Sequence, residues 1–169
     1  TDLGIRAAVA ARVNVTFKIL YNGTVAMTGG QLVEGGQPPW VISRQLAAEG
    51  VVKIAIVSDA RDALLTGANW ANNCQFYDRQ DMMALQQELK SITGVTAIIY
   101  VQDCATELRR KRKRGLIADK PETIMINDAV CEGCGDCAVK SNCVAVKPLI
   151  RPEGEKRQID QNLCNKDMS

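Results

Sequence analysis

The sequence predicts an α/β fold, a parallel sheet with helices on both faces, followed by a small cysteine-rich segment. Apolar, β-branched runs alternate with helical patterns over the first 100 residues, and this alternation predicts the sheet. Five of the seven cysteines lie in the last 39 residues, and this predicts the segment. With 169 residues, 46% of them hydrophobic, the chain can build one buried core and a small appendage.

Three predicted strands form the sheet. Residues 13–21 (VNVTFKILY) are apolar and β-branched, which is typical of a strand buried on both faces. Residues 51–57 (VVKIAIV) and Val95–Val101 (VTAIIYV) have the same character. Ligands of parallel sheets bind at the carboxyl ends of the strands, so the loop after the first strand is a candidate site.

Helical patterns separate the strands. Residues 3–12 are alanine-rich, and residues 40–49 are followed by Gly50, which suits a helix C-terminus. Residues 78–93 carry apolar side chains at helical spacing and are followed by Gly94. We therefore expect helices to cover the sheet on both sides.

The character of the chain changes after Asp103. A polar, basic segment leads into a linker, and we place the domain boundary near Lys120, between a first domain of residues 1–120 and a second of residues 121–169. Residues 124–126 are compatible with a short strand. The chain starts without methionine and stops soon after a cysteine, which indicates a piece of a longer polypeptide.

Composition and charge exclude several classes of function. The chain has no histidine, which excludes Ser-His-Asp and Cys-His catalysis and every zinc site that needs imidazole. Six of the 21 basic residues form the run 109–114, which leaves 15 against 19 acidic residues, so we expect no nucleic-acid partner. No apolar stretch is long enough to span a bilayer and no signal peptide opens the chain, so we expect a cytoplasmic protein with no membrane partner.

The strongest motif is a C-x2-C-x2-C run. It comprises Cys131, Cys134 and Cys137, and an odd cysteine count without a secretory signal favours metal or redox chemistry over disulfides. Soft thiolates without imidazole suit a 4Fe–4S cluster, which four cysteines hold. The fourth ligand is Cys143 or Cys164, and the remaining cysteine is left for a second cluster. Structural zinc is the alternative, although the second C-x2-C pair of a zinc ribbon is missing.

A glycine-rich loop, residues 22–39, follows the first strand. Gly29 and Gly30 let the backbone approach a ligand and expose N–H groups to phosphate oxygens. Asn22 and Thr24 offer a side-chain oxygen and a carbonyl, which suit Mg²⁺. Neither a Walker A motif nor a dinucleotide motif is present, and a purely structural turn is the alternative.

Three motifs together resemble one enzyme family. The stretches KILYNGTVAMTGGQ, CATELRRKRKRG and INDAVCEGCGDCAVKSNC, followed by CNKD, resemble indolepyruvate ferredoxin oxidoreductase and its fused 2-oxoacid relatives in the same order and over nearly the whole chain. The resemblance implies the C-terminal part of a thiamine diphosphate-binding fold in residues 1–120. It implies a truncated, ferredoxin-like iron–sulfur segment in residues 121–169.

The resemblance also implies roles for the glycine-rich loop. Asn22 would bind Mg²⁺ through its side chain and Thr24 through its carbonyl. The residues against the diphosphate would be Thr28, Gly29 and Gly30. The family usually carries aspartate where Gly23 stands, and its Gly-Asp-Gly motif is expected upstream of Thr1, so this chain lacks one Mg²⁺ ligand.

The implied activity is oxidative decarboxylation of a 2-oxo acid of the arylpyruvate or indolepyruvate type. Coenzyme A would take the acyl group, and electrons would pass through the 4Fe–4S cluster to ferredoxin. Other domains or subunits of an oligomeric enzyme would complete the site, and no catalytic acid or base is identified here. The alternatives are a non-catalytic iron–sulfur electron-transfer module on an α/β carrier and a structural zinc-bearing interaction domain.

Two further features have several interpretations. The basic run 109–114 suits a solvated or interdomain face, a docking site for acidic ferredoxin, a grip on coenzyme A phosphates, or nucleic acid. The first of these is the expectation. Cys74 and Cys104 stand alone, and we expect both to be buried small hydrophobic side chains.

Overall fold

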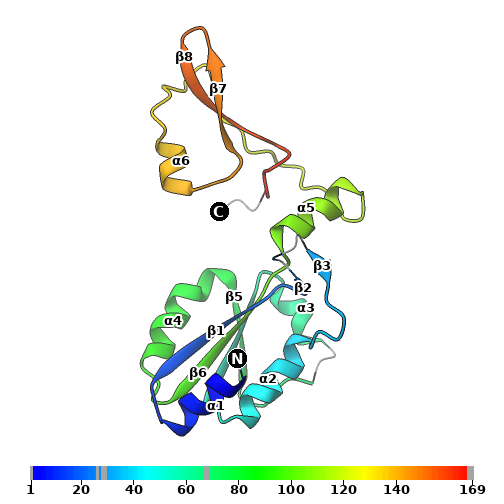
Figure 1. Cartoon of the computed structure of the whole chain (residues 1–169), viewed down its shortest axis with the longest axis vertical. Coiled ribbons are helices and arrows are strands. Elements are labelled where there is room, and N and C mark those ends of the chain that lie inside the picture. The colour runs from blue at the N-terminus through cyan, green and yellow to red at the C-terminus, as the bar shows by residue number, and fades with distance from the viewer. Residues whose placement is uncertain (1, 26, 28–29, 67–68, 167–169) are drawn as a thin grey trace. The chain divides into compact units, whose positions relative to one another are not determined.

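The computed structural model describes residues 2–25, 27, 30–66 and 69–166 (Figure 1). The chain divides into two compact units, Thr1–Cys104 and Ala105–Ser169, and each is described by itself. Lys120, near which we placed the domain boundary from the sequence, lies inside the second unit. In the described part of the chain, no helix is long and apolar enough to cross a membrane.

The first unit is built on a four-stranded parallel sheet, which confirms the predicted α/β class. Its strands lie in the order β1 (Val15–Tyr21), β6 (Val95–Val101), β4 (Lys53–Ser58) and β5 (Cys74–Asp78). The two central strands are buried along most of their length, as their apolar sequences predict. The expectation that β1 is buried on both faces is wrong, because β1 is an edge strand and Leu20 is 77% exposed.

Helices cover both faces of this sheet, as predicted. Helices α1 (Asp2–Ala10) and α2 (Pro39–Ala48) lie on one face, and α4 (Met82–Lys90) lies on the other (Figure 1). The alternation of side chains along β4 explains the two layers: Ile54 and Ile56 belong to the first core cluster. The intervening Ala55 and Val57 belong to the second, with Leu85 and Leu89 of α4.

Glycines end the helices where the sequence predicts. Gly50, after α2, and Gly94, after α4, have φ angles of +93° and +105°, a region that side chains other than glycine rarely adopt. The predicted helix 78–93 starts as a short 3-10 turn, η2 (Arg79–Asp81), before α4 begins. A further short helix, α3 (Arg61–Leu65), was not predicted.

The loop after β1 folds back on itself at the carboxyl edge of the sheet. Its two short strands, β2 (Thr24–Val25) and β3 (Gln31–Leu32), pair antiparallel. The Gly30 N–H donates to the Val25 carbonyl oxygen at 3.2 Å within this turn. The loop therefore contains two short paired strands, which the sequence did not predict.

The second unit contains short elements separated by turns. Helices α5 (Ala105–Lys113) and α6 (Asp136–Ser141) precede a hairpin of β7 (Val146–Arg151) and β8 (Gly154–Ile159). The predicted short strand 124–126 is wrong, because the Ile124 carbonyl accepts the side-chain amide of Gln161 at 2.8 Å in place of a strand partner. The hairpin was not predicted, since Pro148 lies within β7 and breaks the expected pattern.

Candidate functional site

Of the three cysteines of the C-x2-C-x2-C run, Cys131 and Cys134 lie on a tight loop next to β8, and Cys137 lies in the first turn of α6. Cys131 is half-buried, and Cys134 and Cys137 are exposed. Gly133 has a φ of +73°, and a Cβ at this position would collide with the backbone carbonyl of Glu155 on β8. Glycine at this position is therefore required both by the turn and by the close approach of the strand.

Backbone donors surround the first of these sulfurs. The N–H groups of Gly133 and Arg157 donate to the Cys131 sulfur and hold the pKa of that thiol below its usual value. The charges of Lys156 and Arg157 add to this effect. Hydrogen bonds to the charged form favour a thiolate, which is the form of cysteine that binds metals.

The side chain of Arg157 lies over the same loop. A Cβ on Gly135 would be 3.6 Å from Arg157 Nη2, and Nη1 pairs with the carboxylate of Glu155. A further donor, Nε, is covered by the protein itself and has no hydrogen-bond partner among the described residues. A buried donor without an acceptor costs the folded state free energy.

The two other cysteines of the segment differ in exposure. Cys143, just past α6, is exposed, and its N–H donates to Ser141 Oγ at 3.2 Å. Cys164 follows β8 and is only 5% exposed. Its sulfur accepts the Lys166 N–H at 3.4 Å. Both remain candidates for the fourth ligand.

Part of the basic run holds the turn that contains Cys164. Arg109 Nη1 donates to the Leu163 carbonyl at 2.7 Å and to Asn165 Oδ1 at 3.0 Å. Arg112 Nη2 donates to the Asn165 carbonyl at 2.9 Å. The two arginines therefore bind the backbone immediately before and after the cysteine, and we call this pair, Arg109 and Arg112, the arginine brace.

The brace lies beside a pocket of about 200 Å³ that Cys164 also lines. Lys166 closes the turn, since Nζ donates to Asp119 Oδ2 at 2.8 Å and to the Lys120 carbonyl at 3.2 Å. These residues lie within the second unit, so this part of the basic run has an internal structural role.

The described residues contain no group of three or more cysteine, aspartate, glutamate or histidine side chains gathered to hold one metal ion. The four ligands of a structural zinc ion surround one atom, whereas each thiolate of a 4Fe–4S cluster binds a different iron. Both groups stay candidates for these cysteines.

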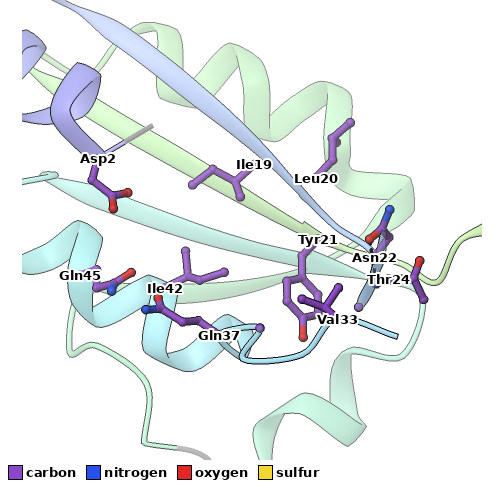
Figure 2. A pocket seen from close by; sticks show the side chains of 12 residues that line it. Asp2, Ile19, Leu20, Tyr21, Asn22, Thr24, Val33, Gln37, Ile42 and Gln45 are labelled. Carbon is purple, nitrogen blue, oxygen red and sulfur yellow. Dashed lines mark hydrogen bonds between the residues drawn. The ribbon is translucent and has the colours of Figure 1, made fainter. Parts of the chain in front are cut away.

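The loop after β1 forms one end of a pocket of about 510 Å³ in the first unit. Figure 2 shows Tyr21, Val33 and Ile42 gathered between β1 and α2, with Asn22 and Thr24 at the end where the strand stops. This end lies at the carboxyl edge of the sheet, where the sequence predicts a ligand site.

The oxygen atoms at this end of the pocket could supply only some of the ligands of a Mg²⁺–diphosphate site. Asn22 Oδ1 accepts the Thr24 N–H at 3.0 Å, which leaves a second lone pair, and Thr24 Oγ1 is buried without a partner. Magnesium also takes carboxylate or water ligands, and neither Asn22 nor Thr24 supplies a carboxylate. Gly30, with a φ of +78°, lies in the neighbouring turn, whereas Thr28 and Gly29 fall outside the described residues.

The two isolated cysteines of the first unit are half-buried, whereas the sequence predicted buried side chains. Cys74 is half-buried and packs against the first core cluster, and burial raises the pKa of its thiol. Cys104 is half-buried as well.

The sequence analysis identified the cysteines and missed the residues that surround them. The basic run was visible, but nothing in it indicated that Arg109 and Arg112 would bind the turn at Cys164. Arg157 stands in an ordinary polar stretch, and only its register on β8 places it beside the cysteine loop.

Comparison with known proteins found no matching family model, no matching curated protein and no matching solved structure.

Proposed function

We propose that the chain is part of a 2-oxoacid ferredoxin oxidoreductase of the arylpyruvate or indolepyruvate type. The second unit would hold a 4Fe–4S cluster, and the first would contribute one side of a thiamine diphosphate–Mg²⁺ site. Thiamine diphosphate supplies the electron sink for decarboxylation, the cluster carries single electrons to ferredoxin, and coenzyme A accepts the acyl group.

The observation that carries the proposal is the cysteine loop on β8. Its glycines have the left-handed backbone angles that a tight turn around a cluster needs, and Gly133 has no room for a side chain. N–H donors point at the Cys131 sulfur, and an unpaired donor of Arg157 is buried beside the loop. Hydrogen bonds to the sulfurs are among the features that set the potential of such clusters.

The support for the thiamine side is the end of the pocket at Asn22 and Thr24. This chain would supply the Asn22 side-chain oxygen and the Thr24 carbonyl to Mg²⁺. The role of these residues is to bind and orient the diphosphate. A carboxylate from another segment would complete the metal's ligands, as the family resemblance implies.

The experiment measures activity and bound cofactor in the full-length protein, purified anaerobically. We expect ferredoxin reduction that depends on an arylpyruvate and coenzyme A, together with tightly bound thiamine diphosphate. Asn22→Ala removes the side-chain oxygen proposed for Mg²⁺ and should weaken thiamine diphosphate retention. Asn72→Ala, at an exposed asparagine of the first unit, is the control and should retain it.

Three outcomes separate the candidate functions. A cluster without thiamine diphosphate would favour the non-catalytic electron-transfer module. Zinc without iron or sulfide would favour the structural interaction domain. If the protein retains thiamine diphosphate but no 2-oxo acid tested supports ferredoxin reduction, the proposed reaction is contradicted. The proposed cofactor site would still stand.

A further inference from the structure

The pocket of about 200 Å³ beside the arginine brace is lined mainly by positive charge. Among the described residues of its wall, four cations stand against one carboxylate, and these are Arg109, Arg112, Lys113 and Lys166 against Asp119. Lys166 Nζ donates to Asp119 Oδ2 at 2.8 Å, so these two opposite charges compensate each other. The other three cations have no acidic partner in this hollow, which we call the basic pocket.

Two of these three cations have hydrogen-bond donors to spare. Arg112 uses Nη2 for the Asn165 carbonyl, and its Nη1 and Nε have no acceptor among the described residues. Solvent reaches both atoms, because the buried side-chain nitrogens and oxygens without a partner in the described part of the chain belong to Thr24 and Arg157. Lys113 is exposed and makes no hydrogen bond or ion pair with the described residues. A ligand that enters the pocket can therefore contact these donors.

This set of donors suits a phosphate group. A guanidinium presents its nitrogens as a planar fork that binds two oxygens of one oxyanion, and an ammonium group adds a compact charge. A phosphate group on an ester carries about two negative charges at pH 7, which matches an excess of cations better than a single carboxylate does. The side-chain amide of Asn162, which also lines the pocket, offers a further donor.

We propose that the basic pocket is a binding site for a dianionic phosphate group, held by Arg112 and Lys113. Such a group can come from inorganic phosphate or from the 3′-phosphate of coenzyme A. The site needs neither the iron–sulfur cluster nor thiamine diphosphate. The assignment to coenzyme A alone rests on the proposed function, in which coenzyme A is a substrate.

The experiment is a calorimetric titration of the full-length protein, purified anaerobically, with inorganic phosphate, with coenzyme A and with dephospho-coenzyme A, which lacks the 3′-phosphate. Lys113→Gln removes a charged donor that holds no other part of the described chain, and it should weaken phosphate binding about tenfold.

Arg114→Gln is the matched control. It removes an exposed cation at the next position, which is not among the described residues of the pocket wall, and it should leave phosphate binding unchanged. Both positions lie at the C-terminal end of α5, so the control also matches any effect on the helix dipole.

Two outcomes support the proposal and identify the source of the phosphate. If coenzyme A binds more tightly than dephospho-coenzyme A and this difference is lost in Lys113→Gln, the pocket takes the 3′-phosphate. If the two bind equally while Lys113→Gln weakens the binding of inorganic phosphate, the pocket takes the free ion.

The remaining outcomes overturn the proposal. Equal weakening in Lys113→Gln and Arg114→Gln would show a general charge effect, and no weakening in Lys113→Gln would show that the phosphate binds elsewhere. A parent protein that binds neither inorganic phosphate nor coenzyme A has no such site. Iron, sulfide and thiamine diphosphate analysis tests the proposed function separately, so either proposal can fail while the other stands.

Discussion

The two units of this chain differ in how much apolar surface each one buries in its own interior. Among the described residues, the buried apolar side chains of the first unit lie on α1, α2, α4, β4 and β6 and in the turns beside them. Of the apolar side chains described in the second unit, only those of Ala145 and Cys164 are buried, while Met125, Val130 and Val139 are largely exposed. The first unit has a hydrophobic core, and the second depends on polar contacts and on its cysteines.

This difference indicates how the second unit reaches stability. A segment of this size rarely buries enough apolar surface to fold without a disulfide, a metal or a partner. Its cysteines are free thiols, and the cluster that we propose would supply folding free energy to this unit by binding them. The comparison therefore predicts that the two units respond differently to the same treatment.

Removal of the cluster should have the largest effect. When iron is chelated from the full-length protein, we expect hydrogen-exchange protection to fall throughout the β7–β8 hairpin and α6, because metal binding is coupled to folding in small metal-binding units. The β4 and β6 amides should keep their protection. Unchanged protection of the hairpin in the metal-free protein would show that the second unit is stable by itself and would break the comparison.

Truncation in the core of the first unit comes next. Leu89→Ala removes a side chain that is 2% exposed and packs with Leu85 and Ile98, so it should cost about 2–5 kcal/mol of unfolding free energy. Met83→Ala, on the exposed side of the same helix, should change stability little. Iron content should be unaffected by either change, and denaturant unfolding with parallel iron analysis measures both quantities.

Most elements of the first unit could be predicted because each of them has a clear local sequence pattern. Buried parallel strands are nearly continuous apolar runs, and the helices between them have a clear period and glycine at their ends. Strand β5 was not predicted, because it is a short edge strand with polar residues at Gln75 and Asp78. The edge position of β1 also could not be read locally, because strand order is a property of the whole sheet.

The arginine brace offers a test of intermediate size within the second unit. Replacing Arg109 and Arg112 by glutamine removes three hydrogen bonds to residues 163 and 165, which should cost about 1–3 kcal/mol locally. We expect faster alkylation of Cys164 in the metal-free protein, as the turn opens more often. Lys113→Gln with Arg114→Gln, at exposed positions of the same basic run, is the control.

An equal alkylation rate in the brace variant and the control would mean that the two arginines do not hold the turn. The basic run would then return to the interpretations left by the sequence, among them the docking of ferredoxin. A selective effect on Cys164 would assign part of the run to internal structure and leave only its remaining residues for a partner.

The cysteine loop itself was predictable and its setting was not. Metal-binding cysteines follow a local spacing, so Cys131, Cys134 and Cys137 stand out in one sequence. The hairpin that supports them depends on a pairing between residues 146–151 and 154–159, and it contains too few apolar residues to give an alternating pattern. The contribution of Arg157 follows from that pairing, so it became visible only with the structure.

The smallest effect is expected at an exposed ion pair of the first unit. The Arg6 guanidinium, on α1, donates hydrogen bonds to the carboxylate of Glu49, at the C-terminal end of α2. This interaction lowers the pKa of the Glu49 carboxyl. A lowered pKa in the folded state contributes stability above the unfolded pKa and loses it as the pH falls through the folded pKa. The difference in melting temperature between the parent and Arg6→Gln should therefore be small at neutral pH and vanish in acid.

Arg44→Gln, at an exposed position of α2, controls for the loss of a surface charge. A difference between the parent and Arg6→Gln that grows on acidification would contradict the role of the pair. Neither variant should alter iron content, since both changes lie in the first unit.

The most direct test of the account is the measurement of iron and acid-labile sulfide in the full-length protein, purified without oxygen. We predict iron and sulfide in equal amounts, with both lost when Cys131 and Cys134 are replaced by serine and both retained when Cys74 is replaced. A protein that contains neither iron nor sulfide after anaerobic reconstitution, or that loses nothing in the Cys131 and Cys134 variant, would contradict it.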